Sequence, residues 1–247
     1  MNRVIFKSFA AVAMATAMFS STNALATPST TLWIPSVDIQ KYGVLHLGVD
    51  TYTTVGKKAD SGGRMFPVDY GLTIGVIPSD AIGLEVGLDM FESSDHPFFY
   101  NVKFALNEGA LGDWSPAIAI GGYNFGTKSE VTDYNMMYVL VAKTLGTLGR
   151  LHLGFYSGND KLLVDKNGKK DASGLLASWD KAVTDKWWLA VDYQGGNNAF
   201  GAISAGFAYT VSPNSSFIFA YNIYNDQNVG GKDKNANTLE FNYDVNF

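Results

Sequence analysis

Apolar residues recur at every second position along most of this 247-residue chain, from Tyr42 to the C-terminus. In segment 82–90, the odd-placed members are Ile, Leu, Val, Leu and Met, and the residues between them are Gly, Glu, Gly and Asp. A β-strand presents alternate residues to opposite faces, whereas a helix would scatter the carboxylates and glycines around its circumference. The pattern therefore predicts an all-β protein, and we find no convincing helical segment.

Twelve segments are predicted to be strands. Nine show a clear alternation: 45–52, 68–77, 82–90, 99–107, 151–156, 187–194, 202–210, 216–224 and 238–247. Three more, 116–125, 135–144 and 175–180, have the composition of strands but no assignable facing. Short turns such as 213–214 alternate with long polar loops such as 158–173, an asymmetry typical of a membrane barrel. We therefore predict a transmembrane antiparallel up-and-down β-barrel of about 12 strands over residues 43–247.

The composition excludes several other classes of protein. Beyond residue 26, no run approaches the roughly 20 apolar residues that a membrane-spanning helix needs. The 18 basic and 23 acidic residues include no long basic block, so no nucleic-acid partner is expected. The chain has no Cys, which excludes a disulfide scaffold and thiolate metal sites.

Residues 1–26 are predicted to be a cleaved secretory signal peptide. They carry Arg3 and Lys7, continue through an apolar stretch, and close with Ala24-Leu25-Ala26, an A-x-A cleavage pattern. Cleavage would remove two basic residues and no acidic ones, leaving the exported part more acidic than the full chain, whose net charge is −5. Residues 27–42 are expected to form an N-terminal segment that lies in the periplasm or folds back into the lumen as a plug.

The last predicted strand places apolar or aromatic residues at every second position back from the terminal Phe247. This pattern resembles the C-terminal signature of the bacterial outer-membrane β-barrel proteins, a porin-like superfamily. The resemblance implies that the barrel-assembly machinery recognises Phe241, Tyr243, Val245 and Phe247. It also implies that the last strand pairs with the first, in the outer membrane of a Gram-negative bacterium. No subfamily is assigned, because the sequence lacks the Arg-rich lumen of oligogalacturonate- or sialate-specific channels.

If the apolar phase faces lipid, the polar phase lines the lumen of the barrel. The pore-lining candidates are His46, Asp50, Glu85, Asp89, Lys103, His152, Asp192, Glu240 and Asp244. Pairing of the first and last strands is expected to bring Asp50 near Glu240 and His46 near Asp244. Facing carboxylates would favour a cation, although solvated wall residues, with Lys103 paired to Glu85 or Asp89, are the simpler interpretation.

Aromatic residues in the polar phase have two possible roles. Tyr52, Tyr156, Trp188 and Tyr224 are expected to form either a lumenal track for a sugar ring or simple space-filling. The sequence alone does not choose between these roles.

Signals for catalysis or metal binding are weak. His46 and His152 fall on the first and seventh predicted strands, on opposite sides of the barrel, so they cannot serve one site. His96 lies in a polar loop, and segment 165–168 matches only a fragment of a calcium loop. No enzymatic activity, metal or cofactor is expected.

The width of a twelve-stranded barrel is intermediate between that of eight-stranded barrels, which side chains fill, and that of 16-stranded barrels, which leave an aqueous channel, so it permits a narrow pore. The expected function is a porin-like channel for passive diffusion of small hydrophilic solutes, with a weak preference for cations. The alternative is a non-conducting plugged barrel with a structural or surface-interaction role, and an outer-membrane lipid hydrolase is less favoured. Outer-membrane lipids, the barrel-assembly machinery and small solutes are the expected partners, and the oligomeric state is left open.

Overall fold

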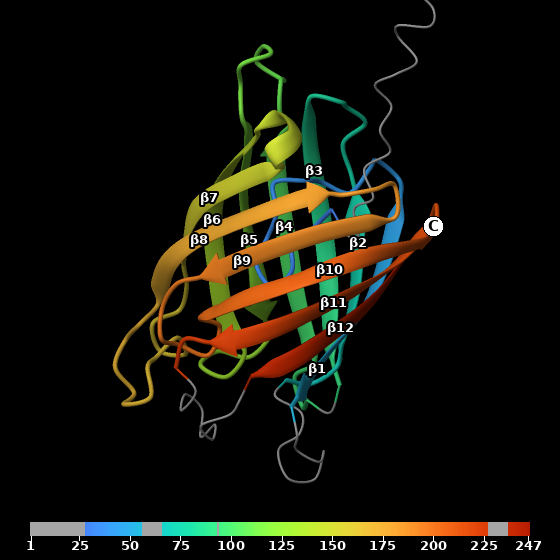
Figure 1. Ribbon diagram of the computed structural model, residues 1–247. Helices are drawn as coiled ribbons and strands as arrows, with labels where there is room; N and C mark the ends of the chain where they lie inside the picture. Colours follow the sequence, from blue (N-terminus) through green and yellow to red (C-terminus); the bar gives the residue numbers. More distant parts are fainter. Residues whose placement is uncertain (1–27, 56–65, 93, 227–236) are drawn as a thin grey trace, which may run out of the picture.

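The computed structural model describes residues 28–55, 66–92, 94–226 and 237–247, which form a closed antiparallel barrel (Figure 1). Each strand pairs with its neighbours in the sequence, and β1 pairs with β12 to close the sheet. The strands are β1 (Leu45–Thr54), β2 (Asp69–Gly75), β3 (Ile82–Phe91), β4 (Phe98–Leu106), β5 (Ala117–Gly126), β6 (Asp133–Thr144), β7 (Arg150–Ser157), β8 (Ser173–Ala182), β9 (Trp187–Gln194), β10 (Ala202–Ser212), β11 (Ser215–Tyr224) and β12 (Thr238–Asn246). The predicted twelve-stranded, all-β up-and-down barrel is confirmed. The predicted signal peptide lies outside the described residues.

Helical structure is nearly absent from this part of the chain. From β1 onwards, the described residues contain one helix, the short 3-10 turn η3 (Gly146–Leu148) between β6 and β7. No helix among the described residues is long and apolar enough to cross a membrane.

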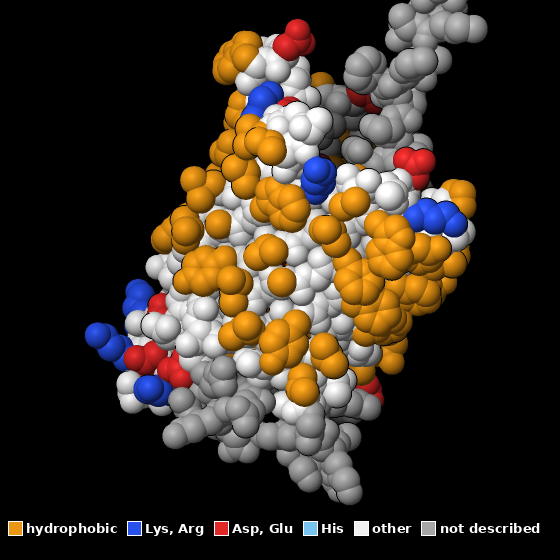
Figure 2. Space-filling view, in the orientation of Figure 1, with side chains coloured by type: hydrophobic (Ala, Val, Ile, Leu, Met, Phe, Trp, Pro, Cys, Tyr) orange, Lys and Arg blue, Asp and Glu red, His pale blue; other side chains and the backbone are white. Residues whose placement is uncertain are grey.

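Alternate residues of each strand lie on the outside and the inside of the barrel. In β9, Trp187, Leu189 and Val191 are exposed, whereas Trp188 and Asp192 are buried. Figure 2 shows apolar side chains across the middle of the visible face and charged side chains mainly near its ends. The barrel therefore has an apolar outer surface, and many of its polar side chains are buried inside.

The three segments without an assignable facing are strands β5, β6 and β8. In β6, buried Met136 and Leu140 alternate with exposed Met137 and Val139, so both faces of the strand are apolar. In β5, the pairing with both neighbours is irregular, and Asn124 has a positive φ of 56°. Bulges of this kind re-aim side chains and interrupt the alternation.

Residues 28–42, here called the N-terminal segment, run through the barrel interior ahead of β1. Ile34 and Val37 are buried in one apolar cluster with side chains of β4 to β8, including Leu140 and Leu176. Leu32 is buried in a second cluster, which contains Trp188 of β9 and Ile218 of β11. The N-terminal segment thus contacts inward-facing side chains of several strands far from it in the sequence.

Candidate solute site in the barrel interior

A cavity inside the barrel lies between the N-terminal segment and side chains of β1 to β5, with contributions from β6, β9 and β12. This cavity has a volume of about 510 Å³. It is called here the acidic cavity, and it is bordered by Asp50 of β1, Asp69 of β2, Asp89 of β3, Trp33 of the N-terminal segment and Tyr123 of β5. Ser94, Val131 and Thr132 also line it, so the cavity reaches the end of the barrel that carries the long loops.

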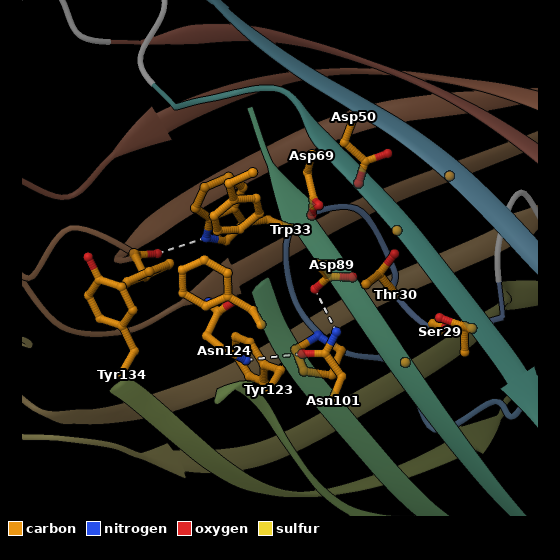
Figure 3. Close-up of a pocket in the computed structure, with 18 of the residues that line it drawn as sticks. Ser29, Thr30, Trp33, Asp50, Asp69, Asp89, Asn101, Tyr123, Asn124 and Tyr134 are labelled. Atoms are coloured by element: carbon orange, nitrogen blue, oxygen red, sulfur yellow. Dashed lines mark hydrogen bonds between the residues drawn. The ribbon is translucent and has the colours of Figure 1, made fainter. Parts of the chain in front are cut away.

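Three carboxylates come from three adjacent strands. Asp50 stands directly opposite Asp69 in the β1–β2 pairing, and Asp89 stands opposite Gly71 of β2. Figure 3 shows Asp50, Asp69 and Asp89 along one side of the pocket. Asn101 Nδ2 donates a hydrogen bond of 2.6 Å to Asp89 Oδ2. Side chains directly opposite in an antiparallel pair have Cβ atoms about 5 Å apart, so these strands concentrate negative charge at one place.

Glycines keep the space in front of these carboxylates open. A Cβ added at Gly71 would lie 3.2 Å from Asp89 Oδ1. A Cβ at Gly48 would lie 3.4 Å from Asp244 Oδ1 and 3.7 Å from Asp50 Oδ1. Asp50 and Asp244 therefore approach the same space above Gly48 from neighbouring strands.

The basic side chains of the cavity wall already have partners. Lys103 Nζ lies 3.0 Å from Glu85 Oε1 and donates a hydrogen bond of 3.0 Å to the carbonyl oxygen of Ser29. His46 Nε2 lies 3.2 Å from Asp244 Oδ1. Asp244 is only 3% exposed, and its other oxygen, Oδ2, has no hydrogen-bond partner among the described residues. The acidic cavity is thus lined by more carboxylic than basic side chains.

Aromatic side chains border the same cavity. The ring of Trp33 packs edge-on against Tyr52, with centroids 5.4 Å apart, and lies 5.5 Å from Phe66. Its indole N–H donates a hydrogen bond of 2.7 Å to the carbonyl oxygen of Phe200. A rigidly held apolar surface therefore stands beside the carboxylates.

The four aromatic residues proposed as a track occupy three different places. Tyr52 and Tyr224 both pack against Trp33. Tyr156 is fully buried in the cluster around Ile34, and its hydroxyl donates to the carbonyl oxygen of Gly195. Trp188 packs in the cluster with Leu32. Space-filling therefore describes Tyr156 and Trp188.

Polar contacts hold the N-terminal segment inside the barrel. Asp192 Oδ2 accepts hydrogen bonds from three successive backbone N–H groups, those of Leu32, Trp33 and Ile34, at 2.9, 2.8 and 3.1 Å. Arg150 binds both carboxylate oxygens of Asp38, at 2.7 and 2.5 Å. Backbone amides in a dry interior need such acceptors, because an unpaired buried N–H is costly.

The nine predicted lumenal residues all lie on the inward face, but they fall into different environments. Those that line the acidic cavity are His46, Asp50, Glu85, Asp89, Lys103 and Asp244. Among the other three, Asp192 holds the N-terminal segment, and His152 Nε2 lies 2.8 Å from Asp180. Glu240 accepts hydrogen bonds from Asn222 and Asn242.

The pairing of β1 with β12 makes both expected pairs diagonal neighbours in the sheet. His46 contacts Asp244, as predicted. Asp50, however, stands opposite Asn242, whereas Glu240 stands opposite Tyr52. Asp50 and Glu240 are thus diagonal neighbours, offset by two residues in the register, and both side chains lie on the inward face.

Several residues of the interior were missed by the sequence analysis. Asp69 shares the inward phase of Gly71 and Thr73, and this phase was the signal that could have identified it. Asp180 lies in β8, whose facing was not assigned, and Asp38 lies in a segment without periodicity. Arg150 directly precedes the predicted strand 151–156.

The C-terminal residues with the assembly signature lie in β12 and at the end of the chain. Phe241 and Tyr243 pack against Phe217 of β11, with ring centroids 5.4 and 4.9 Å apart. Phe247 is 70% exposed, and its N–H donates to the carbonyl oxygen of Leu45.

The segment that resembles part of a calcium loop forms a hydrogen-bonded turn. Asp165 Oδ1 accepts hydrogen bonds from the N–H groups of Lys169 and Asn167, at 2.9 and 2.8 Å. These two N–H groups hold the pKa of the Asp165 carboxyl below its usual range. Within the described ranges, no group of three or more His, Asp or Glu side chains is arranged to hold a metal ion.

Comparison with known proteins gives matches to solved structures only, since no family model and no curated protein sequence matches the chain. The KdgM porin is 10% identical, with a TM-score of 0.52 over 83% of this chain and 98% of that one. The KdgM porin in complex with disordered oligogalacturonate is 9% identical, with a TM-score of 0.53 and the same coverage. The NanC porin is 12% identical, with a TM-score of 0.48 over 82% of this chain and 98% of that one. The chain therefore has the fold of the outer-membrane β-barrel porins.

Proposed function

We propose that this protein is an outer-membrane, porin-like channel through which small hydrophilic solutes diffuse passively, with a weak preference for cations. The proposal includes export through the signal peptide 1–26 and assembly guided by Phe241, Tyr243, Val245 and Phe247. The observation that carries it is the acidic cavity, which lies inside a closed barrel and reaches its long-loop end.

The outer surface supports a location in a bilayer. Many large apolar side chains are exposed on the strands, for example Leu153 at 59% and Phe155 at 51%. Soluble monomers rarely expose contiguous apolar patches larger than a few hundred Å². A strand in hydrocarbon has no water to satisfy its backbone, so a sheet that crosses a bilayer must close on itself, as this one does.

The charge of the cavity supports a preference for cations. Asp50, Asp69 and Asp89 border the space, whereas Lys103 is already paired with Glu85. A ring or cluster of carboxylates in a narrow passage attracts cations and repels anions.

The N-terminal segment supports a second function, that of a plugged barrel with a structural or surface-interaction role. Its apolar residues Leu32, Ile34 and Val37 fill the interior beside β5 to β11, and Asp192 and Arg150 bind it. A segment so well packed would close the passage unless it moves.

Currents across a planar lipid bilayer separate the two functions. We expect stable single-channel currents from the purified barrel, and larger ones after deletion of residues 28–40, which would widen the lumen. Silence of both proteins, under conditions where a known porin conducts, would contradict the channel. Silence of the full chain together with conduction by the deletion variant would identify a plugged barrel.

Reversal potentials in a salt gradient test the preference for cations. The double variant Asp50→Asn, Glu240→Gln should keep its conductance and lose part of its cation selectivity. Asp185→Asn is the matched control, since Asp185 is exposed in the turn between β8 and β9. Unchanged selectivity in the double variant would show that these two side chains do not act on the passing ions.

A further inference from the structure

We propose that the acidic cavity is a binding site for a small aliphatic amine that carries two or more ammonium groups. This inference deepens the proposed function, on which it rests, by naming the class of solute that the cavity would bind.

The cavity is lined by more carboxylate side chains than cationic side chains. Asp50, Asp69, Asp89 and Asp244 line the space, while Lys103 is bound to Glu85 and to the backbone of Ser29. His46 contacts only one oxygen of Asp244. Charge buried without a partner is strongly unfavourable, so a cationic ligand would stabilise this arrangement.

Two carboxylate oxygens of the cavity wall are unpaired among the described residues. Asp244 Oδ2 and Asp69 Oδ1 are shielded from solvent and have no hydrogen-bond partner among the described residues. Asp244 is 97% buried, and its side chain borders the cavity beside Asp50, above Gly48. Native structures pair nearly all such atoms, so these oxygens indicate positions for donors supplied by a bound molecule.

The spacing of the carboxylates fits more than one ammonium group. Asp244 stands opposite Gly48, two residues along β1 from Asp50. At ~3.3 Å per residue, the backbone positions of Gly48 and Asp50 are about 6–7 Å apart along the strand direction. Asp69 stands opposite Asp50, whereas Asp89 stands opposite Gly71, in the same row across the sheet as Gly48 and Asp244. An extended diamine can therefore place one ammonium between Asp50 and Asp69 and the other in the row of Asp244 and Asp89.

The same geometry disfavours a bare metal ion. A metal site needs three or more ligands that converge within about 2.5 Å of one point. The described carboxylates are instead distributed around a cavity of about 510 Å³, and no three or more of them are arranged to hold a metal ion. This volume suits an organic molecule and its remaining water.

The aromatic residues supply a surface for the hydrocarbon part of the ligand. Trp33 is fixed by its hydrogen bond to Phe200 and by ring contacts with Tyr52 and Phe66. In Figure 3, Trp33 and Thr30 border the space towards which Asp50, Asp69 and Asp89 are turned. Aromatic rings bind methylene groups by contact and ammonium groups by cation–π attraction.

Calorimetric titration of the full exported chain, purified and folded in detergent, tests the proposal with three four-carbon probes. These are 1,4-diaminobutane, 1,4-butanediol and succinate, which share a chain length and differ in charge. We expect saturable binding of the diamine, and none of the diol or of succinate, at the same concentrations. Equal binding of the diol, or stronger binding of succinate, would overturn the proposal.

Variants of the carboxylates locate the site. Asp69→Asn and Asp89→Asn should each weaken diamine binding about tenfold, because each removes a charge from a partly dry site. Asp185→Asn removes an exposed charge elsewhere and should leave the affinity unchanged. Unfolding by urea checks that each variant is folded, and diamine binding that persists in the double variant Asp69→Asn, Asp89→Asn would assign the amine to another site.

Binding and conductance together separate this inference from the proposed function. Diamine binding without any current would support the site and contradict the open channel. Current without diamine binding would leave the channel in place and overturn the amine site.

Discussion

The two sides of the barrel interior differ in the side chains that line them, although they belong to one continuous sheet. The side formed by β1 to β4 carries Asp50, Asp69 and Asp89 between glycines, and it borders a cavity. The side formed by β5 to β11 carries Met136, Leu140 and other apolar side chains that pack against the N-terminal segment. The first will be called the open wall and the second the packed wall. The comparison shows that the N-terminal segment divides one lumen into a core and a site.

The largest effect is expected where the packed wall holds the N-terminal segment. Replacing Asp192 with Ala leaves three buried N–H groups without their acceptor, at about 1–3 kcal/mol for each such group, so the free energy of unfolding should fall by roughly 3 kcal/mol or more. Urea titration of the detergent-folded barrel measures the loss. Asp192→Asn keeps one acceptor oxygen and should lose less.

A similar small loss in both Asp192 variants would contradict this prediction. It would mean that the three hydrogen bonds contribute little and that apolar contacts of Leu32 and Ile34 hold the N-terminal segment.

An intermediate effect is expected from a pair of glycines on neighbouring strands. A Cβ at Gly83 would lie 2.7–2.9 Å from three side-chain atoms of Ile39, whereas a Cβ at Gly71 meets only Asp89 Oδ1, at 3.2 Å. Gly83→Ala should therefore reduce the free energy of unfolding by about 1–3 kcal/mol through overpacking. Gly71 faces the cavity, so Gly71→Ala should change the free energy of unfolding by about 0.5 kcal/mol or less.

Urea titration of the two alanine variants, side by side, compares two glycines of the open wall, one that faces the N-terminal segment and one that faces the cavity. Equal losses at Gly71 and Gly83 would show that the cavity is as tightly constrained as the region around Ile39.

The smallest effect is expected at the turn between β4 and β5, where the open and packed walls meet. Glu108 lies 2.9 Å from Lys143 Nζ and accepts hydrogen bonds from Thr144. Burial alone would raise the pKa of Glu108, but the hydrogen bonds from Lys143 and Thr144 outweigh it and lower that pKa. A lowered pKa in the folded state means that ionised Glu108 stabilises the fold at neutral pH, and that this contribution is lost as the pH falls through the folded-state value.

Glu108→Gln should therefore reduce the free energy of unfolding at neutral pH by only about 0.5 kcal/mol, since both side chains of the pair are partly exposed to solvent. The difference between wild type and variant should shrink in acid, as followed by urea titration at several pH values. A difference that grew towards low pH would contradict the sign derived from the pKa.

The contrast between the walls also explains what the sequence could predict. On the open wall, apolar outward residues alternate with Gly, Thr and Asp, so β1, β2 and β3 were recognised with their facing. On the packed wall, β6 has Met136 and Leu140 inside and Val139 outside, and β8 has Leu176 inside beside exposed Leu175. Both faces of such strands are apolar, which removes the signal that assigns their facing.

Other features depend on contacts between distant residues and so were not predictable from local pattern. The N-terminal segment has no periodicity, and its position is determined by Asp192 and Arg150, more than a hundred residues away. The exact register of β1 against β12, which places Asp50 opposite Asn242, is not determined by the alternation, because a shift of two residues keeps the same faces.

The distant anchoring of the N-terminal segment has a consequence for the order of folding. Residues 32–34 precede every strand of the barrel, yet the carboxylate that binds them lies on β9, about 160 residues later. Contacts of such long sequence separation form late, because the intervening chain must first be ordered. The first described part of the protein is therefore among the last to reach its final place, and the sheet must close around it.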